Sequence, residues 1–526
     1  MSCARSELVK RIAAEIVRRR VKDKEGANKI KVEVTRALSV DPVPSDTEVI
    51  GALLEMGHRE LAEALRKRPV KTRSGVSVIT VVLPLFLCPH GRCIYCPGGG
   101  STGISQSYTG REAWVAFAAS IGYDVRRQVE AQTSRLSSMG HQVDKVELIF
   151  IGGTFTAAPE EFQRNAIKEA LDGLHGPCSS LEEALERAEL AVPRVSGITV
   201  ETKPDWAKGS ICDELLRMGV TRVEIGVQAL DDEVYKVVKR GHTVQDVTEA
   251  TADLKDRAFK VTYHVMPGLP CSTPQRDREW FRQLFEDQRF RPDALKIYPT
   301  MVLPHTPLQK MYERGEYEPY DLEEMVELLV DWLSIVPPYV RVNRIRREIP
   351  NDAVTAGAWP GNLRQIVERR MRSKGIRCRC VRCREVGNPE AWRGVDPSDV
   401  SFEVRELRYA ASYGTDVFIS FEDPKHGLLA GLLRLRLPER YPNELTEDAA
   451  LVRELHVYGP VVPVGARDRT YWQHRGVGAE LMRRAEEIAE SEGRKRVIVI
   501  SAVGVREYYY RLGYRRKGPY VSKDLQ

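Results

Sequence analysis

The chain has 526 residues, of which 42% are hydrophobic and 29% are charged. These proportions are ordinary for a globular protein and exclude a wholly disordered chain, and the length predicts about three domains. No apolar run approaches the length of a membrane span, and the N-terminus has no signal-peptide core. We therefore expect a cytoplasmic protein with no membrane contact.

The net charge of the chain is +6, and two segments are much more basic than the rest. Residues 1–40 contain eleven Lys and Arg against five acids, and residues 341–384 contain thirteen against three. Two such segments on an otherwise balanced chain indicate a polyanion partner, and we expect nucleic acid. Solvated helix faces are the alternative.

Residues 1–70 predict a basic helical segment, broken at 41–48, where Ser45 and Asp46 are candidate caps for the next helix. Residues 71–340 alternate apolar strands with amphipathic helices, which predicts an incomplete TIM-like α/β barrel of parallel strands. The expected strands are 76–83, 145–151, 197–202, 222–227, 260–266 and 294–299. The expected helices include 159–172, 180–189, 277–286 and 321–335. Functional sites of such barrels lie at the carboxyl ends of the strands.

Residues 341–394 form a basic, cysteine-containing linker in this interpretation. Residues 395–526 then predict a second α/β domain with two strands, a long helix, a strand, a short helix and a last strand.

Cys88, Cys93 and Cys96 follow the first expected strand. Three thiolates this close can hold three irons of a 4Fe–4S cluster and leave the fourth iron open for a small molecule. A zinc knuckle is the alternative. With the glycine pair after the second strand, this pattern resembles the radical S-adenosylmethionine (SAM) superfamily. The resemblance implies SAM contacts from Gly152, Gly153, Thr154, Glu201, Lys203 and Gln228.

The segment 473–482, QHRGVGAELM, is a glycine-containing loop that opens a helix, which suits the binding of a phosphate group. With the later run YYYRLGY, it is similar to the GNAT acetyltransferase fold. That similarity implies acetyl-CoA at the loop and Tyr509, with Tyr508 beside it, as a general acid near the thioester sulfur. Core packing is the alternative for the tyrosines.

Cys378, Cys380 and Cys383 lie within six residues of the linker, among five arginines. They predict a zinc site whose fourth ligand comes from elsewhere in the chain. Three free thiols, or a second Fe–S cluster, are the alternatives.

The whole chain resembles the catalytic subunit family of Elongator, the tRNA uridine acetyltransferases. The resemblance rests on stretches such as CPHGRCIYCPGG, ETKPDW, KIYPTMVLPHTPL, CRCVRCREVG and RELHVYG. It implies that residues 1–40 and 341–384 bind the anticodon stem-loop of tRNA. It also implies that the protein acts either with Elongator-type subunits or alone. It also implies acetyl-CoA contacts from Lys145, Glu454, Leu455, His456, Val457, Gln473, Gly476, Val477, Gly478, Ala479 and Tyr509.

The implied reaction uses a SAM-derived radical to take hydrogen from the acetyl methyl group. The resulting carbon radical adds to C5 of the wobble uridine, and thioester hydrolysis leaves a carboxymethyl group. We therefore expect both cofactor sites to converge on one flipped base. Two other functions stay open at this point. One is a protein lysine acetyltransferase with a structural Fe–S domain, and the other is a non-catalytic tRNA-binding scaffold.

Overall fold

The computed structural model describes residues 3–21, 23–38, 42–65, 75–84, 86–99, 102–459 and 476–525. Its first part is a group of four helices with a hydrophobic core of its own. These helices are α1 (Cys3–Arg18), α2 (Lys24–Leu38), α3 (Asp46–Glu55) and α4 (Arg59–Ala64). Ser45 caps α3 as expected, because its hydroxyl accepts from Glu48 N–H while the Glu48 carboxylate accepts from Ser45 N–H.

The second part is a half-barrel of seven parallel strands in the order of the sequence. The strands are β1 (Ser77–Val82), β2 (Lys145–Ile151), β3 (Arg194–Thr202), β4 (Arg222–Gln228), β5 (Lys260–Val265), β6 (Ala294–Ile297) and β7 (Arg341–Ile345). The first six confirm the expected strands. The seventh extends the sheet past residue 340, into the segment that we assigned to the linker.

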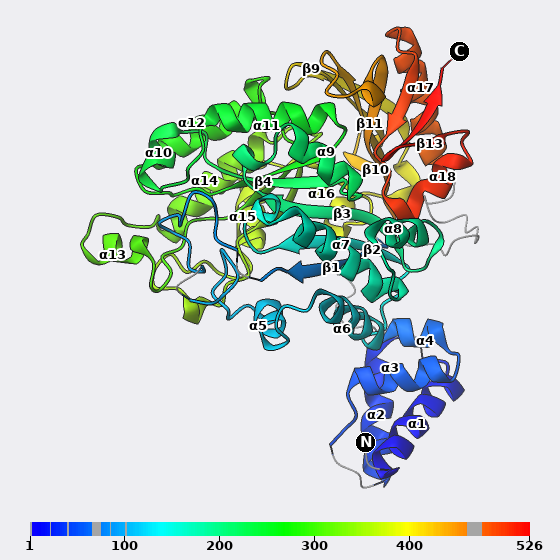
Figure 1. Ribbon diagram of the computed structural model, residues 1–526. Coiled ribbons are helices and arrows are strands. Elements are labelled where there is room, and N and C mark those ends of the chain that lie inside the picture. The colour runs from blue at the N-terminus through cyan, green and yellow to red at the C-terminus, as the bar shows by residue number, and fades with distance from the viewer. Residues whose placement is uncertain are drawn as a thin grey trace.

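Helices connect and cover these strands (Figure 1). They are α5 (Ala113–Ser120), α6 (Val125–Ser138), α7 (Glu160–His175), α8 (Leu181–Leu190), α9 (Ser210–Arg217), α10 (Asp232–Val237), α11 (Val244–Asp256), α12 (Pro274–Glu286), α13 (Pro307–Glu313) and α14 (Leu322–Ile335). After β7 come α15 (Leu363–Ser373), which packs on α14, and the short α16 (Val381–Arg384). Among the helices of the described ranges, none combines the length and the apolar character needed to cross a bilayer.

The third part is a separate mixed sheet with the order β13-β14-β12-β11-β10-β9-β8. Its strands are β8 (Glu403–Ala410), β9 (Gly414–Asp423), β10 (Leu428–Pro438), β11 (Ala449–Val457), β12 (Arg496–Val499), β13 (Arg515–Lys517) and β14 (Tyr520–Asp524). The long helix α17 (Val477–Ser491) packs on β10 and β11, and α18 (Arg506–Tyr510) precedes β13. The architecture confirms the predicted α/β class with a half-barrel followed by a second domain.

The second sheet lies at the amino-terminal ends of the barrel strands (Figure 1). Arg453 of β11 donates to the carbonyl of Phe259, the residue before β5, and Arg434 of β10 donates to the carbonyl of Asp293, the residue before β6. Gly504 packs directly on the backbone of Val195, near the start of β3. One hydrophobic core runs through the barrel into this sheet.

Candidate functional site

The first cysteine triplet lies in the loop after β1, at the carboxyl edge of the half-barrel. Cys93 and Cys96 are buried and Cys88 is half-buried. His90 Nε2 lies 3.1 Å from the Cys93 sulfur, and Arg240 Nη1 donates to the same sulfur at 3.6 Å. The Cys93 sulfur therefore lies among polar side chains.

The other two sulfur atoms also have polar neighbours. Gln106 Nε2 donates to the Cys96 sulfur at 3.2 Å, and the Cys88 sulfur lies 3.5 Å from Thr154 Oγ1. Burial raises the pKa of both Cys88 and Cys96, so these thiols need a metal to become thiolates at neutral pH.

The spacing of the sulfur atoms distinguishes a cluster from a single ion. Zinc binds sulfur at about 2.3 Å, which puts tetrahedral sulfur ligands about 3.8 Å apart. Among the described residues, ligand atoms that all lie within 4.8 Å of one another include the linker cysteines but not Cys88, Cys93 and Cys96. This triplet is therefore spaced more widely than the linker triplet, as expected for a cubane in which each sulfur binds a different iron.

The glycine pair after β2 packs against the cysteine loop. Gly152 and Gly153 have φ of 126° and 112°, which side chains rarely adopt. A Cβ on Gly152 would lie 2.5 Å from Ser105 Oγ, and one on Gly153 would lie 2.9 Å from Gln106 Cβ. The two glycines therefore let the strand end approach the loop closely.

Three further residues with predicted SAM contacts lie at or near the ends of the next strands. Lys203 is buried and donates to Asp205 at 3.1 Å. Gln228 is buried with φ of 72°, and its Oε1 has no hydrogen-bond partner among the described residues. Such strain and an unpaired polar atom are typical of a binding site. Glu201 instead points toward the barrel interior, where Lys296 Nζ donates to it at 3.3 Å.

The predicted acetyl-CoA residues gather at the opposite end of the strands. The α17 helix begins after Gly476, whose φ of 83° is left-handed and which provides no side-chain cap. The first backbone N–H groups of a helix have no partner within the helix and suit an anion. A Cβ on Gly478 would lie 2.5 Å from Tyr508 Oη and 3.8 Å from Leu455 Cδ2. The start of α17, the end of β11 and Tyr508 therefore form one site. Gln473 lies outside the described residues.

Tyr509 does not share the position of Tyr508. It is 6% exposed and packs in the core of the second domain with Tyr514. Tyr508 is half-buried and faces the α17 turn. Burial raises the pKa of both tyrosines, so each is protonated at neutral pH.

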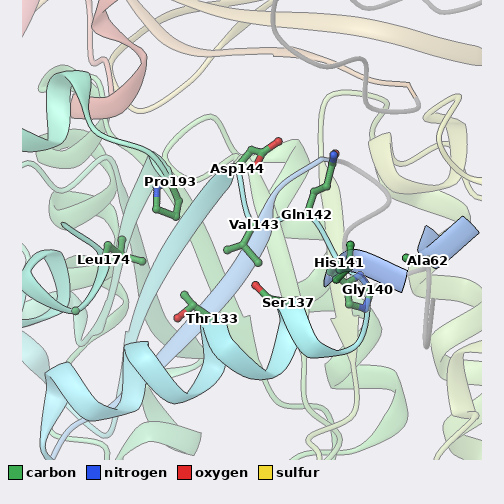
Figure 2. Close-up of a pocket in the computed structure, with 12 residues that line it drawn as sticks. Ala62, Thr133, Ser137, Gly140, His141, Gln142, Val143, Asp144, Leu174 and Pro193 are labelled. Carbon is green, nitrogen blue, oxygen red and sulfur yellow. The ribbon is translucent and has the colours of Figure 1, made fainter. Parts of the chain in front are cut away.

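Lys145 begins β2 and lies at this same end of the barrel. Burial lowers its pKa, although Asp144 opposes the shift. Next to it, a pocket of about 340 Å³ opens between α6, the start of β2 and the helical N-terminal part (Figure 2). Ala62, Ser137, Gln142 and Asp144 are among the residues that line it. The structure thus brings Lys145 to the predicted acetyl-CoA end.

We expected the two proposed cofactor sites to converge on one base. They lie at opposite ends of the barrel strands, and charged side chains inside the barrel connect them. Glu454 of β11 lies at the end of this interior that is formed by the amino-terminal ends of the barrel strands. Burial opposes its ionisation, yet the charges of Lys260, Arg434 and Arg222 hold its pKa well below the usual range.

The interior also contains three residues that we did not single out, Glu224, His264 and Lys296. His264 Nε2 lies 2.8 Å from Glu224 Oε2, and Lys296 forms an ion pair with the same carboxylate. The sequence contains a partial signal, because polar residues alternate with apolar ones in RVEIGVQ and KVTYHV, and Lys296 interrupts the apolar strand ALKI.

The linker cysteines meet in space. The sulfur atoms of Cys378, Cys380 and Cys383 lie within 4.8 Å of one another, as one metal ion requires. Hydrogen bonds from the other two thiols lower the pKa of Cys380 well below its usual value. No fourth His, Cys, Asp or Glu joins this group among the described residues.

The two basic segments divide into paired and exposed residues. Arg19 pairs with Glu33, Arg341 with Glu385 and Arg370 with Glu323. These arginines support the local fold through their ion pairs and are therefore less available to bind a partner. Exposed basic residues of these segments that form no ion pair among the described residues are Lys10, Arg11, Arg20, Arg36, Arg369, Arg377 and Arg379. Arg344 and Arg372 are exposed but pair with Glu348 and Glu390.

Three family models match the chain. The ELP3 N-terminal domain matches residues 5–73, the radical SAM superfamily matches 82–283, and the radical SAM C-terminal domain matches 292–373. Together they cover the helical part and the half-barrel.

Relatives extend the similarity over the whole length. A tRNA uridine(34) acetyltransferase of Methanocaldococcus jannaschii is 41% identical over 99% of this chain and 97% of its own. Elongator complex protein 3 of Homo sapiens is 41% identical over 95% of this chain and 93% of its own. The solved structure of Methanocaldococcus infernus Elp3 with an N-terminal deletion matches with a TM-score of 0.74 and 38% identity, over 86% of this chain and 100% of that one.

Proposed function

Because the chain belongs to the Elongator complex protein 3 (Elp3) family, we propose that it adds an acetyl-derived carboxymethyl group to C5 of uridine 34, the wobble base of tRNA. The observation that carries this proposal is the 41% identity to a tRNA uridine(34) acetyltransferase over 99% of the chain. The C5–H of uridine is not acidic, so acyl transfer to a nucleophile does not make the new carbon–carbon bond. A radical SAM half-barrel joined to a second α/β domain suits this need.

At the carboxyl end of the barrel, Cys88, Cys93 and Cys96 would hold a 4Fe–4S cluster with SAM on its open iron. When bound, the cluster supplies the electron for SAM cleavage. The free Oε1 of Gln228 would accept a hydrogen bond from SAM. Gly152, Gly153 and Thr154 would let SAM approach the end of β2, and Lys203 would add a positive charge there.

At the opposite end, the first N–H groups of α17 would bind the pyrophosphate of acetyl-CoA. The end of β11, Glu454 to Val457, would contact the pantetheine arm, and Lys145 would meet the cofactor from the barrel side. Tyr508 Oη lies closest to the turn, so it would give its proton to the departing thiolate, with Tyr509 packed behind it. Burial lowers the pKa of His456 to about 4, which leaves its ring neutral and able to accept a proton from an attacking water.

The anticodon stem-loop of tRNA would bind through the exposed arginines of the two basic segments. The linker cysteines would hold one zinc ion, which would fix this otherwise self-repelling stretch against β7. The proposal leaves the enzyme able to act alone or with Elongator-type subunits.

The test uses full-length protein purified without oxygen and incubated with SAM, acetyl-CoA, a reductant and tRNA. We expect 5-carboxymethyluridine in the digested tRNA by mass spectrometry, and none with Cys93→Ser. Cys271→Ser is the matched control, since Cys271 is an exposed thiol outside both triplets. Acetylation of a lysine peptide at a similar rate without tRNA would favour the protein acetyltransferase instead. Binding of tRNA with no SAM cleavage would favour the scaffold.

A further inference from the structure

Four charged or polar side chains meet inside the half-barrel, on the concave face of the sheet. They are Glu201 of β3, Glu224 of β4, His264 of β5 and Lys296 of β6. Residues of β3 and β6 touch although β4 and β5 separate these strands, so they meet across the interior. We call these four residues the interior cluster.

The interior cluster is not a metal site. Glu201, Glu224 and His264 have ligand atoms within 4.8 Å of one another, but Lys296 Nζ pairs with both carboxylates. The ammonium group therefore occupies the position that a cation would take. Burial opposes the charge on both partners, yet Glu224 raises the pKa of Lys296 and Lys296 lowers that of Glu224, so both stay ionised.

The cluster has an anchored side and an accessible side. The Glu224 side chain is 1% exposed and holds both His264 and Lys296. The side chains of Glu201 and Lys296 keep 17% and 12% of their surface accessible. Thr262, which is the register partner of Glu224 on the neighbouring strand, has a buried hydroxyl with no hydrogen-bond partner among the described residues. Accessible charges next to an unpaired polar atom are typical of a site that receives a polar ligand.

The interior cluster lies between the two proposed cofactor sites. Lys203, two residues after Glu201, reaches toward the cysteine loop at one end. Arg222 and Lys260, which precede Glu224 and His264 on their strands, approach Glu454 at the other end. A base that must react with a group from each cofactor has to lie between them.

Aromatic rings and a guanidinium group lie beside the interior cluster. The Arg347 guanidinium lies 5.1 Å from the ring centre of Tyr108 and 5.9 Å from that of Tyr298. The Tyr298 ring also meets His264 edge-on at 5.4 Å. Proteins hold unstacked bases between aromatic rings and arginine planes.

We propose that the interior cluster binds the uracil ring of the substrate, with Glu201 accepting the N3–H and Lys296 donating to a ring carbonyl. Glu224 is a positioning residue that holds Lys296, and His264 in turn holds the Glu224 carboxylate. This inference rests on the proposed function and names the residues that would select its base.

The same contacts explain why cytosine would be rejected. Uracil presents acceptor, donor and acceptor groups at O2, N3 and O4, whereas cytosine has an acceptor at N3. A carboxylate facing that acceptor leaves two buried acceptors opposed, and a site built for hydrogen bonds rejects such a mismatch strongly.

The test measures binding of anticodon stem-loop RNAs to the full-length protein by fluorescence anisotropy at fixed salt. The RNAs carry uridine, cytidine or 3-methyluridine at position 34, and the last lacks the N3–H. We expect the wild type to prefer uridine by about tenfold over both. Glu201→Gln should reduce this preference to within about twofold, because an amide can also donate to N3 of cytosine. Lys296→Gln should weaken uridine binding about tenfold.

The matched control is Glu249→Gln, which changes a surface carboxylate that also pairs with a lysine, Lys208, at 2.8 Å. It should keep the wild-type preference, and melting temperatures show whether each variant folds. A wild type without preference, or a preference that survives in both Glu201→Gln and Lys296→Gln, overturns the inference. Missing 5-carboxymethyluridine in the wild type, with the preference intact, counts against the proposed function instead.

Discussion

Arg453 of the second sheet and Asp293 of the barrel form a bidentate ion pair, with distances of 2.5 and 2.7 Å between nitrogen and oxygen. Both side chains are almost fully buried. Arg453 also contacts Asp416, which pairs with Lys255 and Arg436. The network fixes β11 against the amino-terminal ends of the barrel strands. It therefore sets the position of Glu454 at that end of the barrel interior.

We expect Asp293→Asn to lower the free energy of unfolding by about 3 kcal/mol, because it leaves a buried guanidinium without its partner charge. Denaturation by urea, followed by circular dichroism, measures the change. The control is Asp331→Asn, which breaks the exposed pair with Arg278 and should change the free energy by less than about 1 kcal/mol. Equal effects of the two variants would contradict the structural role of the network.

Thioester turnover should depend on Tyr508 more than on Tyr509. Tyr508→Phe removes the hydroxyl at the α17 turn and should slow acetyl-CoA hydrolysis about 100-fold. Tyr509→Phe should cause a smaller loss, since that ring packs in the core. Iron content should stay normal in both. Tyr510→Phe, at an exposed neighbour, serves as the control, and a larger loss from Tyr509→Phe would restore Tyr509 as the general acid.

The zinc ion that we propose at the linker cysteines should be removable without loss of the proposed barrel cluster. Cys380→Ser should abolish bound zinc, measured by mass spectrometry of the metal content, and leave the iron content unchanged. The melting temperature should fall, because binding of a structural metal contributes to folding. Cys178→Ser changes a half-buried thiol outside both triplets and should leave both metals in place. Iron loss in Cys380→Ser would indicate a second Fe–S cluster instead.

Binding of tRNA should weaken steeply with salt through the exposed arginines. Arg377→Ala and Arg379→Ala should each reduce the slope of log affinity against log salt by about one, because both arginines are exposed and form no ion pair among the described residues. Arg370→Ala is the control, because Arg370 already pairs with Glu323 and Glu327 and should change the slope little. Titrations at several salt concentrations provide the slopes, and equal slopes for all three variants would exclude these residues from the RNA interface.

The sequence predicted six of the seven barrel strands, because each is a short apolar run followed by a helical pattern. The seventh, RVNRI, has only Val342 and Ile345 as apolar residues, so its place in the sheet depends on pairing with β6. A strand is predicted from a local run of apolar residues, so a strand that depends on pairing with its neighbour is missed.

The cysteine triplets were visible from spacing alone, since close thiols have few other uses. The interior cluster was not, because Glu201 and Lys296 are 95 residues apart and only the barrel brings them together. The same applies to Arg453 and Asp293, 160 residues apart. The relative placement of the two sites also depended on how the second sheet docks, which no motif encodes.

Placing the two proposed cofactor sites at opposite ends of the barrel would give each spent product a separate exit. Free CoA should leave beside α17 and the remains of SAM beside the cysteine loop, so neither departure waits for the other. Added CoA is then expected to compete with acetyl-CoA and to leave the apparent affinity for SAM unchanged.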